Sequence, residues 1–467
     1  MMTAFCVALM ILLTLCAYGA PLRLHPENPH YFLFRDKPEV LITSAEHYGA
    51  VLNLDFDYAK YLETLQRDGM NHTRTFVGAY MEPESAFGIA RNTLAPAAGR
   101  LICPWARSNT PGYAKGGNKF DLTRWDDAYF ARLTDFVRQA SDRGIVVEIN
   151  LFCPFYGDGQ WNISPMNAAN NVNSVGKVSR EKAYSLTESD GLQAVQEAMT
   201  RKVVTELNEF DNIFFEIMNE PYVKGVPDDW QRRIADVIVE TEEGLPNRHL
   251  ISQNIANGKA QVTAPHPAVS ILNFHYAWPP VTVGMNYRLN RVIGDNETGF
   301  KGTADEHYRR EGWAFILAGG GLYNNLDYSF TVGHEDGTFQ YPNSQPGGGG
   351  PEVRKQLRAL GDFIRGFDFI RMKPLGAEIN AGQARGWGLA DPGRQYAVYL
   401  YDPADEARDV RAELSLDAPP GSYSVRWVSP VSGETVQESK VDHGEGRLEL
   451  TSPAFRRDIA LAIRARP

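Results

Sequence analysis

Short apolar runs rich in β-branched and aromatic residues alternate along most of the chain with segments whose apolar residues recur at helical spacing. Tyr58, Tyr61, Leu62 and Leu65 show that spacing after the first run. Alternation of this kind is typical of βα units, which build a parallel sheet. Eight runs qualify as strands, at residues 39–44, 70–76, 145–151, 212–218, 249–254, 268–274, 290–295 and 322–328.

Eight strands with helices between them predict a (β/α)8 TIM barrel rather than an open, doubly wound sheet, for which the chain lacks a glycine fingerprint. We assign this barrel to residues 21–374. The long excursions 77–124 and 152–188 each follow a strand and should lie on the C-terminal face, where barrel enzymes place their active sites. Their aromatic residues could stack on sugar rings or simply hold the loops in place: Tyr80, Trp105, Tyr113, Phe155, Tyr156 and Trp161.

From residue 375 the pattern changes to short runs of alternating apolar and polar residues, separated by Pro, Gly and Asp. The clearest runs are 396–401, 423–428, 448–450 and 459–463. A period of two with frequent turn residues is typical of antiparallel strands. Residues 375–467 are therefore predicted to form a small antiparallel β-sandwich, an accessory domain that follows the barrel.

Residues 4–16 carry no charge and are almost wholly apolar, and small residues follow within 17–20. This pattern predicts a secretory signal peptide over residues 1–20 and a secreted or periplasmic protein. Because no lysine or arginine precedes the apolar stretch, an uncleaved membrane anchor is the alternative. Cleavage would leave Cys103 and Cys153, which could form one disulfide bond, although we favour two free thiols in loop walls.

The composition narrows the class of partner. The formal charge of −10 is spread along the sequence without a block of lysine or arginine, so nucleic acid and anionic membranes are not expected partners. The ten histidines form neither a His-x-His pair nor a His-Glu-x-x-His motif, and we expect no metal and no other cofactor. A neutral polymer or small substrate suits this composition better, and we expect a monomer.

Two of the predicted strands end in a glutamate. The run at 212–218 leads into Asn219 and Glu220, and the run at 290–295 leads into Glu297. The carboxyl ends of parallel barrel strands meet at one face, so both carboxyl groups should lie in the same mouth. Retaining glycoside hydrolysis requires such a pair. We assign Glu220 as the general acid/base, because Asn219 beside it can hold a sugar hydroxyl, and Glu297 as the nucleophile.

Three more polar residues lie at strand ends. His275 and Tyr276 close the sixth run, where the hydroxyl could donate to the nucleophile and the imidazole could contact a sugar hydroxyl. Arg74 closes the second run and could hold the nucleophile ionised through charge-assisted hydrogen bonds. Isolated residues of these types are usually structural, but their register with two candidate carboxylates favours a role in the site.

With these residues in this order, residues 23–372 resemble the retaining glycoside hydrolases of clan A, close to the cellulase-like glycoside hydrolase family 5. In that group an arginine follows strand two, Asn-Glu follows strand four, a His-x-Tyr element follows strand six and the nucleophile follows strand seven. The resemblance implies a glycosidase in which the matching positions of this chain have these roles. The region after the barrel resembles a collagen-binding-type β module that accompanies related bacterial barrels.

The chain also departs from the family pattern. Its third strand ends in Asn150, where many members carry a histidine, and His275 and Tyr276 are contiguous instead of one residue apart. These departures concern positions that contact substrate and leave the two glutamates of the pattern in place. We expect further substrate contacts from residues near other strand ends: Glu46 with its neighbour His47, Asn150, Trp278 and Asn325.

A barrel can lose activity, so a non-catalytic glycan- or matrix-binding protein is the alternative from another functional class. The presence of both Glu220 and Glu297 favours an enzyme that cleaves O-glycosidic bonds of a poly- or oligosaccharide. The sugar, its linkage and endo or exo action depend on the shape of the two long loops.

Overall fold

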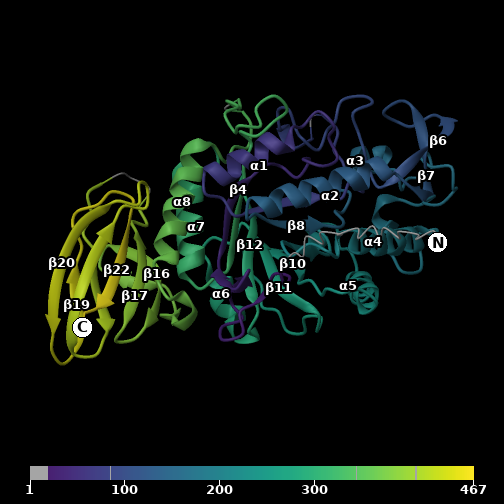
Figure 1. Cartoon of the computed structure of the whole chain (residues 1–467). Coiled ribbons are helices and arrows are strands. Elements are labelled where there is room, and N and C mark those ends of the chain that lie inside the picture. The colour runs from purple at the N-terminus through teal and green to yellow at the C-terminus, as the bar shows by residue number, and fades with distance from the viewer. Residues whose placement is uncertain (1–18, 85, 343, 405–407, 467) are drawn as a thin grey trace, which may run out of the picture.

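The structure is a computed structural model that describes residues 19–84, 86–342, 344–404 and 408–466. It consists of a barrel with flanking helices and, on one side of it, antiparallel sheets (Figure 1). Residues 1–18 of the expected signal peptide lie outside the described residues. Within the described part of the chain, no helix is long and apolar enough to cross a membrane.

Eight parallel strands form the barrel wall in the order β4-β13-β12-β11-β10-β9-β8-β5. The predicted fold class is confirmed, and each strand overlaps one of the eight runs. Helices cover the outside and side chains fill the inside, so most of these strands are buried along their whole length. The strands are β4 (Leu41–Ala45), β5 (His72–Phe76), β8 (Val146–Asn150), β9 (Ile213–Glu216), β10 (Ile251–Asn257), β11 (Val269–His275), β12 (Val292–Thr298) and β13 (Leu322–Leu326).

The barrel is nearly closed, because β4 and β5 at the two ends of this order adjoin without a regular strand ladder. Asn71, which precedes β5, bridges them with its side-chain amide. The backbone N–H of Ile42 donates to its Oδ1 at 2.8 Å, and its Nδ2 donates to the carbonyl of Val40 at 2.9 Å. The amide thus supplies partners for backbone groups that would otherwise be buried unpaired at the seam.

Helices alternate with the strands, and local sequence sets where they begin. Asp57 and Asp126 accept hydrogen bonds from the first backbone N–H groups of α1 and α2. Pro351 occupies the first turn of α8, where its fixed φ suits the helix. The helices are α1 (Tyr58–Arg67), α2 (Asp127–Asp142), α3 (Asp158–Ile163), α4 (Leu192–Leu207), α5 (Asp228–Glu243), α6 (Val281–Asn286), α7 (Asp305–Leu317) and α8 (Pro351–Arg365), with 3-10 turns η1 (Ala86–Gly88), η2 (Arg180–Lys182), η3 (Pro221–Val223), η4 (Tyr287–Leu289) and η5 (Phe369–Arg371).

The two ends of the barrel are covered differently. At the N-terminal end a small sheet of β1 (Arg23–Leu24), β2 (Phe32–Phe34) and β3 (Lys37–Glu39) packs Phe32 and Phe34 against residues at the starts of the barrel strands. At the C-terminal end the loops are long, and the excursion after β5 contains the hairpin β6 (Trp105–Pro111) and β7 (Asn118–Trp125). The long loops that can line an active site therefore lie at the C-terminal end of the barrel.

The C-terminal region contains two antiparallel sheets that share a core. Val398 and Leu400 of β17 pack against Leu414 and Leu448 of the smaller sheet. The larger sheet has β14 (Lys373–Pro374), β15 (Ile379–Ala381), β16 (Ala384–Asp391), β17 (Gln395–Tyr401), β19 (Gly421–Val428), β20 (Thr435–His443) and β22 (Asp458–Ala465), and the smaller one has β18 (Glu413–Asp417) and β21 (Arg447–Thr451).

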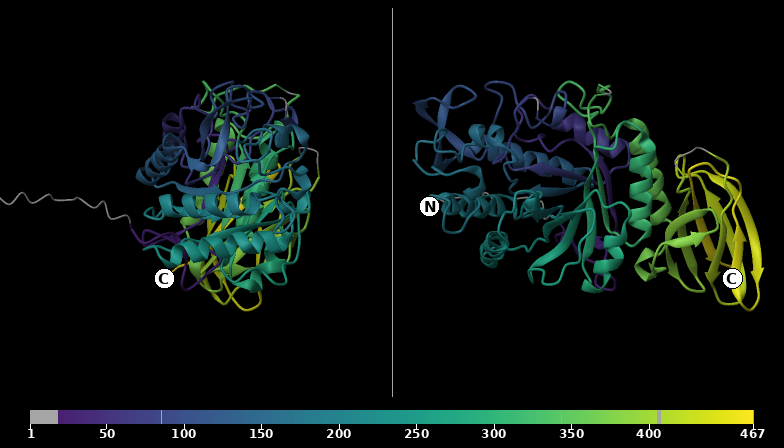
Figure 2. Two further views of the ribbon diagram at one scale, coloured as in Figure 1. Left: turned by 90° about the vertical axis from the view of Figure 1, so that its right-hand side faces the viewer. Right: turned by 180° about the vertical axis from the view of Figure 1, so that it is seen from behind.

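The other face of the larger sheet packs on α7 and α8, as the views from the front and from behind both show (Figures 1 and 2). Arg309 of α7 donates to both carboxylate oxygens of Asp458 in β22, at 2.8 and 3.2 Å, and the hydroxyl of Tyr399 donates to the same carboxylate at 2.9 Å. Trp313 of α7 stacks on the ring of Tyr399. These groups are buried, so the barrel and the larger sheet share one continuous core.

This buried ion pair should be needed for stability. Asp458→Ala would leave the Arg309 guanidinium buried without its counter-charge, so we expect a loss of about 3–5 kcal/mol in the free energy of unfolding, seen as a lower thermal midpoint by circular dichroism. The control is Asp409→Ala, which removes an exposed ion pair with Arg456 and should leave the midpoint nearly unchanged. Equal effects of the two substitutions would contradict this prediction.

Candidate active site

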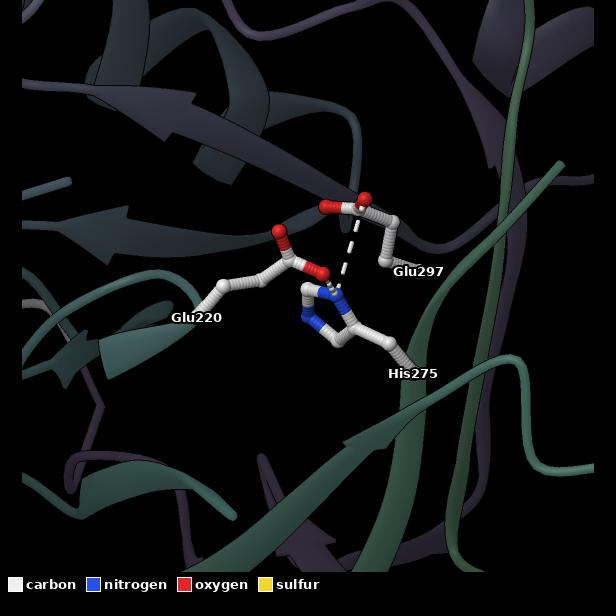
Figure 3. A group of neighbouring side chains, drawn as sticks. All are labelled: Glu220, His275 and Glu297. Carbon is white, nitrogen blue, oxygen red and sulfur yellow. Dashed lines mark hydrogen bonds and ion pairs between the residues drawn. The ribbon is translucent and has the colours of Figure 1, made fainter. Parts of the chain in front are cut away.

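Glu220 and Glu297 lie together at the C-terminal mouth of the barrel (Figure 3). Glu297 belongs to β12, whereas Glu220 comes after β9 and directly precedes η3. Glu220 has a left-handed backbone with φ of 37°, uncommon for a residue with a side chain, and its N–H donates to Asn254 Oδ1 at 3.1 Å. One carboxylate oxygen of each glutamate lies within 4.8 Å of the other.

His275 lies between the two carboxylates. Its Nδ1 is 3.1 Å from Glu220 Oε1 and 3.5 Å from Glu297 Oε1. Burial acts to lower the pKa of His275, but the charge of Glu297 and the hydrogen bond with Glu220 outweigh it and raise the pKa overall. Burial acts to raise the pKa of Glu220, but the bond with His275 and its charge bring the pKa below the ordinary value. The free site therefore favours a protonated His275 beside an ionised Glu220.

Both oxygens of Glu297 accept hydrogen bonds. Tyr276 donates its hydroxyl to Oε1 at 2.7 Å, and Tyr48 donates to Oε2 at 3.1 Å. Arg74 Nη1 donates to Oε2 at 3.2 Å. Donors on both oxygens, one of them a guanidinium, stabilise the anionic carboxylate and fix its orientation.

Arg74 is fully buried and reaches across the barrel interior. Its Nε donates to Glu216 Oε2 at 2.7 Å, and its Nη2 donates to Asn219 Oδ1 at 2.9 Å. Burial raises the pKa of Glu216 to about 8 and also raises the pKa of nearby Glu148. Asn296 Nδ2 donates to both of these carboxyl groups. The barrel below the site is thus a polar network that holds more carboxyl groups than it has cations.

The site opens into a pocket with a cavity volume of about 280 Å³. Aromatic and apolar side chains form most of its wall, with a few polar groups among them, as is usual for a site that binds a small molecule. Tyr156 donates its hydroxyl to Glu220 Oε2 at 2.6 Å and accepts from Asn219 Nδ2 at 2.9 Å. The lining comprises His47, Tyr48, Phe76, Tyr80, Glu82, Phe87, Leu94, Cys153, Tyr156, Asn219, Glu220, Val223, Asn257, Tyr276, Glu297 and Phe300.

The structure brings together six of the site residues predicted from the sequence: Arg74, Asn219, Glu220, His275, Tyr276 and Glu297. The two cysteines of the predicted mature chain, Cys103 and Cys153, are free and buried, as we favoured.

Of the five remaining candidates, His47 lines the pocket and the other four lie outside its lining. Glu46 accepts from the N–H groups of Gly49 and Ala50 and so holds the loop after β4. Asn325 donates to Ser44 Oγ between β13 and β4. Both the Oδ1 and the Nδ2 of Asn150 are buried without a hydrogen-bond partner among the described residues. Trp278 packs its ring against Trp387 and Tyr401 of the C-terminal region, with centroids 5.8 and 5.3 Å apart.

Sequence reasoning missed several residues of the pocket. Tyr48 and Glu82 lie on loops, and Asn257 ends β10 beyond the predicted run 249–254, so no strand-end motif marked them. Tyr80 and Tyr156 were among six loop aromatics that the pattern could not rank, and the other four lie outside the lining. The signal that could have identified Tyr48 was its position directly after the candidate pair Glu46-His47.

Glu220, His275 and Glu297 also form the group of described residues whose ligand atoms lie near enough for one metal ion. The oxygens of both glutamates already accept hydrogen bonds from Tyr156, Tyr276, Tyr48 and Arg74. A guanidinium in direct contact with Glu297 would repel a cation there. The donor set therefore suits two carboxylates in acid/base and nucleophilic roles better than a metal centre.

Residues 55–248 match a family model described as cellulase, glycosyl hydrolase family 5. The chain is a glycosidase. The matched segment includes Arg74 and Glu220 and ends before β11 and β12, which carry His275 and Glu297. No curated protein matches the chain.

Solved structures of glycoside hydrolases share the fold. A protein of Bacteroides vulgatus ATCC 8482 named as a candidate glycoside hydrolase aligns with a TM-score of 0.64 and 14% identity over 96% of this chain and 82% of that chain. A glycoside hydrolase family 5 protein of the same organism gives 0.60 and 13%, over 95% and 93%. A glycoside hydrolase family 5 mannosidase from Rhizomucor miehei gives 0.51 and 12%, over 74% and 99%. The collagen-binding-type relationship of the C-terminal region stays a prediction.

Loss of the Tyr276 hydroxyl should weaken catalysis. A hydrogen bond to a charged acceptor contributes about 1.5–3 kcal/mol, so Tyr276→Phe should lower kcat/KM about 10- to 100-fold, measured on an aryl glycoside that the parent hydrolyses. The control is Tyr58→Phe, which removes a hydroxyl that donates to Asp135 on the outside of the barrel at 2.6 Å. The prediction fails if both variants retain parental activity.

His275 should make stability depend on pH in a defined direction. Its raised pKa means that its protonation stabilises the fold below the unfolded pKa of about 6.5, and that this contribution is lost as pH rises through the folded value. The lowered pKa of Glu220 acts with the opposite sign, because its contribution is present above an unfolded pKa of about 4.3 and is lost as pH falls. We therefore expect His275→Gln to lower the thermal midpoint more at about pH 6 than at about pH 9. A penalty that grows toward alkaline pH would contradict a protonated His275.

Proposed function

We propose that the protein is a secreted glycoside hydrolase that cleaves O-glycosidic bonds of a poly- or oligosaccharide with retention, using Glu220 as the general acid/base and Glu297 as the nucleophile. The separation of the two carboxyl groups carries this proposal, since one oxygen of each lies within 4.8 Å of the other. Retaining enzymes place the groups about 5–5.5 Å apart, whereas inverting enzymes need about 6.5–9.5 Å to admit a water molecule.

Glu297 is suited to attack the anomeric carbon. Tyr276, Tyr48 and Arg74 donate hydrogen bonds that orient its carboxylate, and the residue faces the pocket. Attack forms an ester between Glu297 and the sugar while the bond to the leaving oxygen breaks. In the second step water attacks the same carbon, which releases Glu297 as a carboxylate and leaves the sugar with its original configuration.

His275 supplies a place for the proton that the leaving oxygen needs. In the free site the proton rests on His275, and one transfer along the 3.1 Å contact to Glu220 Oε1 produces the carboxylic acid. The charge of Glu297 supports the charge of His275, and that support disappears as Glu297 forms its ester. Attack by Glu297 therefore favours movement of the proton through Glu220 to the leaving oxygen. In the second step the ionised Glu220 takes a proton from the attacking water.

Secretion is supported by the uncharged apolar stretch at residues 4–16, and a carbohydrate substrate is supported by the family match over residues 55–248 and by the aromatic pocket wall. Rings of the pocket can stack on the apolar faces of a sugar, while the few polar groups bind its hydroxyls.

Azide rescue tests the roles of the two glutamates. Glu297→Gly should be inactive on 2,4-dinitrophenyl glycosides, and azide should restore product release by entering the vacated space and giving a glycosyl azide of inverted configuration. Glu220→Ala should lose about 10²–10⁴-fold in kcat/KM on glycosides with poor leaving groups and should give an azide product of retained configuration, which NMR identifies.

Two results would overturn this assignment. One is an inverted azide product from Glu220→Ala, which would exchange the roles of the residues. The other is a parent protein that releases no product from a broad panel of aryl glycosides and polysaccharides, which would point instead to a protein that only binds glycans.

A further inference from the structure

A third carboxyl group lines the pocket, and the mechanism above does not use it. Glu82 lies in the excursion after β5 and is 2% exposed. Glu297 lines the same pocket. Burial raises the pKa of Glu82 to about 7, and the charge of Glu297 adds to that rise. Glu82 therefore faces the same cavity as the catalytic pair.

Glu82 is held in a fixed orientation without an ionic partner. Tyr80 donates its hydroxyl to Oε1 at 2.9 Å, and Asn92 Nδ2 donates to Oε2. In the described part of the chain, the one ion-pair partner within range is His47, whose Nε2 lies 3.9 Å from Oε2. Burial lowers the pKa of His47 to about 3, so this histidine is neutral and does not compensate a charge.

A buried carboxyl with unused hydrogen-bonding capacity needs a polar partner. In the ionised form, which is populated above a pKa of about 7, each oxygen of Glu82 can accept about two hydrogen bonds, and each accepts one from the protein. His47 Nδ1, which belongs to the same wall, is buried without a hydrogen-bond partner among the described residues. Unpaired buried groups cost free energy, so this wall is suited to a ligand that supplies hydroxyl groups.

The position of Glu82 in the pocket indicates which part of a substrate it meets. The wall around it is closed, with Leu94 and Tyr80 each 1% exposed. The exposed apolar lining residues lie beside the general acid or beside a ligand of the nucleophile. Phe87, 44% exposed, packs on Tyr156, which donates to Glu220, and Phe300, 38% exposed, packs on Tyr276, while Val223 is 40% exposed. Val223 lies three residues after Glu220, so the general acid adjoins the mouth. The leaving group then faces the mouth, and the sugar that bonds to Glu297 lies inward against the closed wall.

We propose that Glu82 accepts hydrogen bonds from two neighbouring hydroxyl groups at the non-reducing end of the sugar bound to Glu297, so that the enzyme removes single terminal residues from an uncharged glycan. The inference rests on the proposed function. The cavity of about 280 Å³ lies at the lower limit of the roughly 300–1,000 Å³ common for ligand sites, which suits one sugar and part of the next.

The same placement determines which sugars are excluded. Glu82, Glu220 and Glu297 give the cavity three carboxyl groups, and Arg74 is already paired with Glu297 and Glu216. A terminal uronic acid would bring a fourth carboxyl group against them without a free cation in the lining to receive it. The pocket should therefore accept neutral hexosides and reject the matching glucuronides.

The test combines a protein variant with deletions on the substrate. The 4-nitrophenyl glycosides of glucose, mannose and galactose, in both anomeric forms, are compared first, and the 3-, 4- and 6-deoxy analogues of the best substrate are then assayed. At least one deoxy analogue should lose about 10- to 100-fold in kcat/KM with the parent. Glu82→Gln should lower kcat/KM by a similar factor on the full substrate. On that deoxy analogue it should lower kcat/KM little further, because both changes remove the same hydrogen bond.

Glu84→Gln is the matched control, since Glu84 is exposed in the same loop and lies outside the pocket lining. It should keep parental kinetics on every substrate. If Glu82→Gln behaves like this control, or lowers kcat/KM equally for full and deoxy substrates, the inference is wrong. The deoxy series with the parent gives an answer even if Glu82→Gln does not fold, because the absence of any sensitive hydroxyl would overturn it.

A labelled oligosaccharide tests the predicted exo action. A neutral hexasaccharide of the best sugar, labelled at its reducing end, should lose one residue at a time from the opposite end, and early internal fragments would contradict the inference. These failures are distinct from failure of the proposed function. A parent that hydrolyses glycosides and shows azide rescue keeps that function whatever Glu82 does, whereas a parent inactive on every substrate loses both.

Discussion

The buried guanidinium of Arg74 is the interaction on which the arrangement of the site depends. Arg74 is a residue of β5. Its guanidinium donates to Glu216 at the end of β9, to Asn219 in the loop that follows, and to Glu297 on β12. A planar group with donors in fixed directions ties these elements at defined distances. The spacing of Glu220 and Glu297 follows, because one is attached to the loop of Asn219 and the other is held directly.

The environment of Arg74 explains why the barrel interior is polar at this end. TIM barrels usually fill the interior with branched apolar side chains, yet here Glu148, Glu216 and Asn296 surround the guanidinium. A buried charge is tolerated only when it is paired and hydrogen-bonded. Burial raises the pKa values of Glu148 and Glu216, and the charge of Glu148 adds to the rise at Glu216. The two glutamates of the site thus lie above a buried polar network of Arg74, Glu148, Glu216 and Asn296.

The parts of the fold that follow from local pattern were predictable. The eight barrel strands are apolar runs of the right length between amphipathic helices, and the change of period after residue 375 marked the antiparallel strands. Glu220 and Glu297 were predictable for a related reason, since a residue at the end of a parallel strand must appear at the mouth of a barrel. Loop residues carry no such constraint. Trp278 lies near the end of β11, which predicts a substrate contact, but its ring packs against Trp387 and Tyr401.

The sequence by itself determined the fold class, the order of the strands and the residues at their carboxyl ends, because periodicity and strand direction are properties of short segments. The tertiary structure alone decided which loop side chains reach those ends. Tyr48, Tyr156 and Glu82 come from three separate loops, and only the closure of the barrel brings them to one cavity. It also decided the charge states, since the protonation of His275 and Glu220 depends on burial and on a contact across 55 positions of the chain.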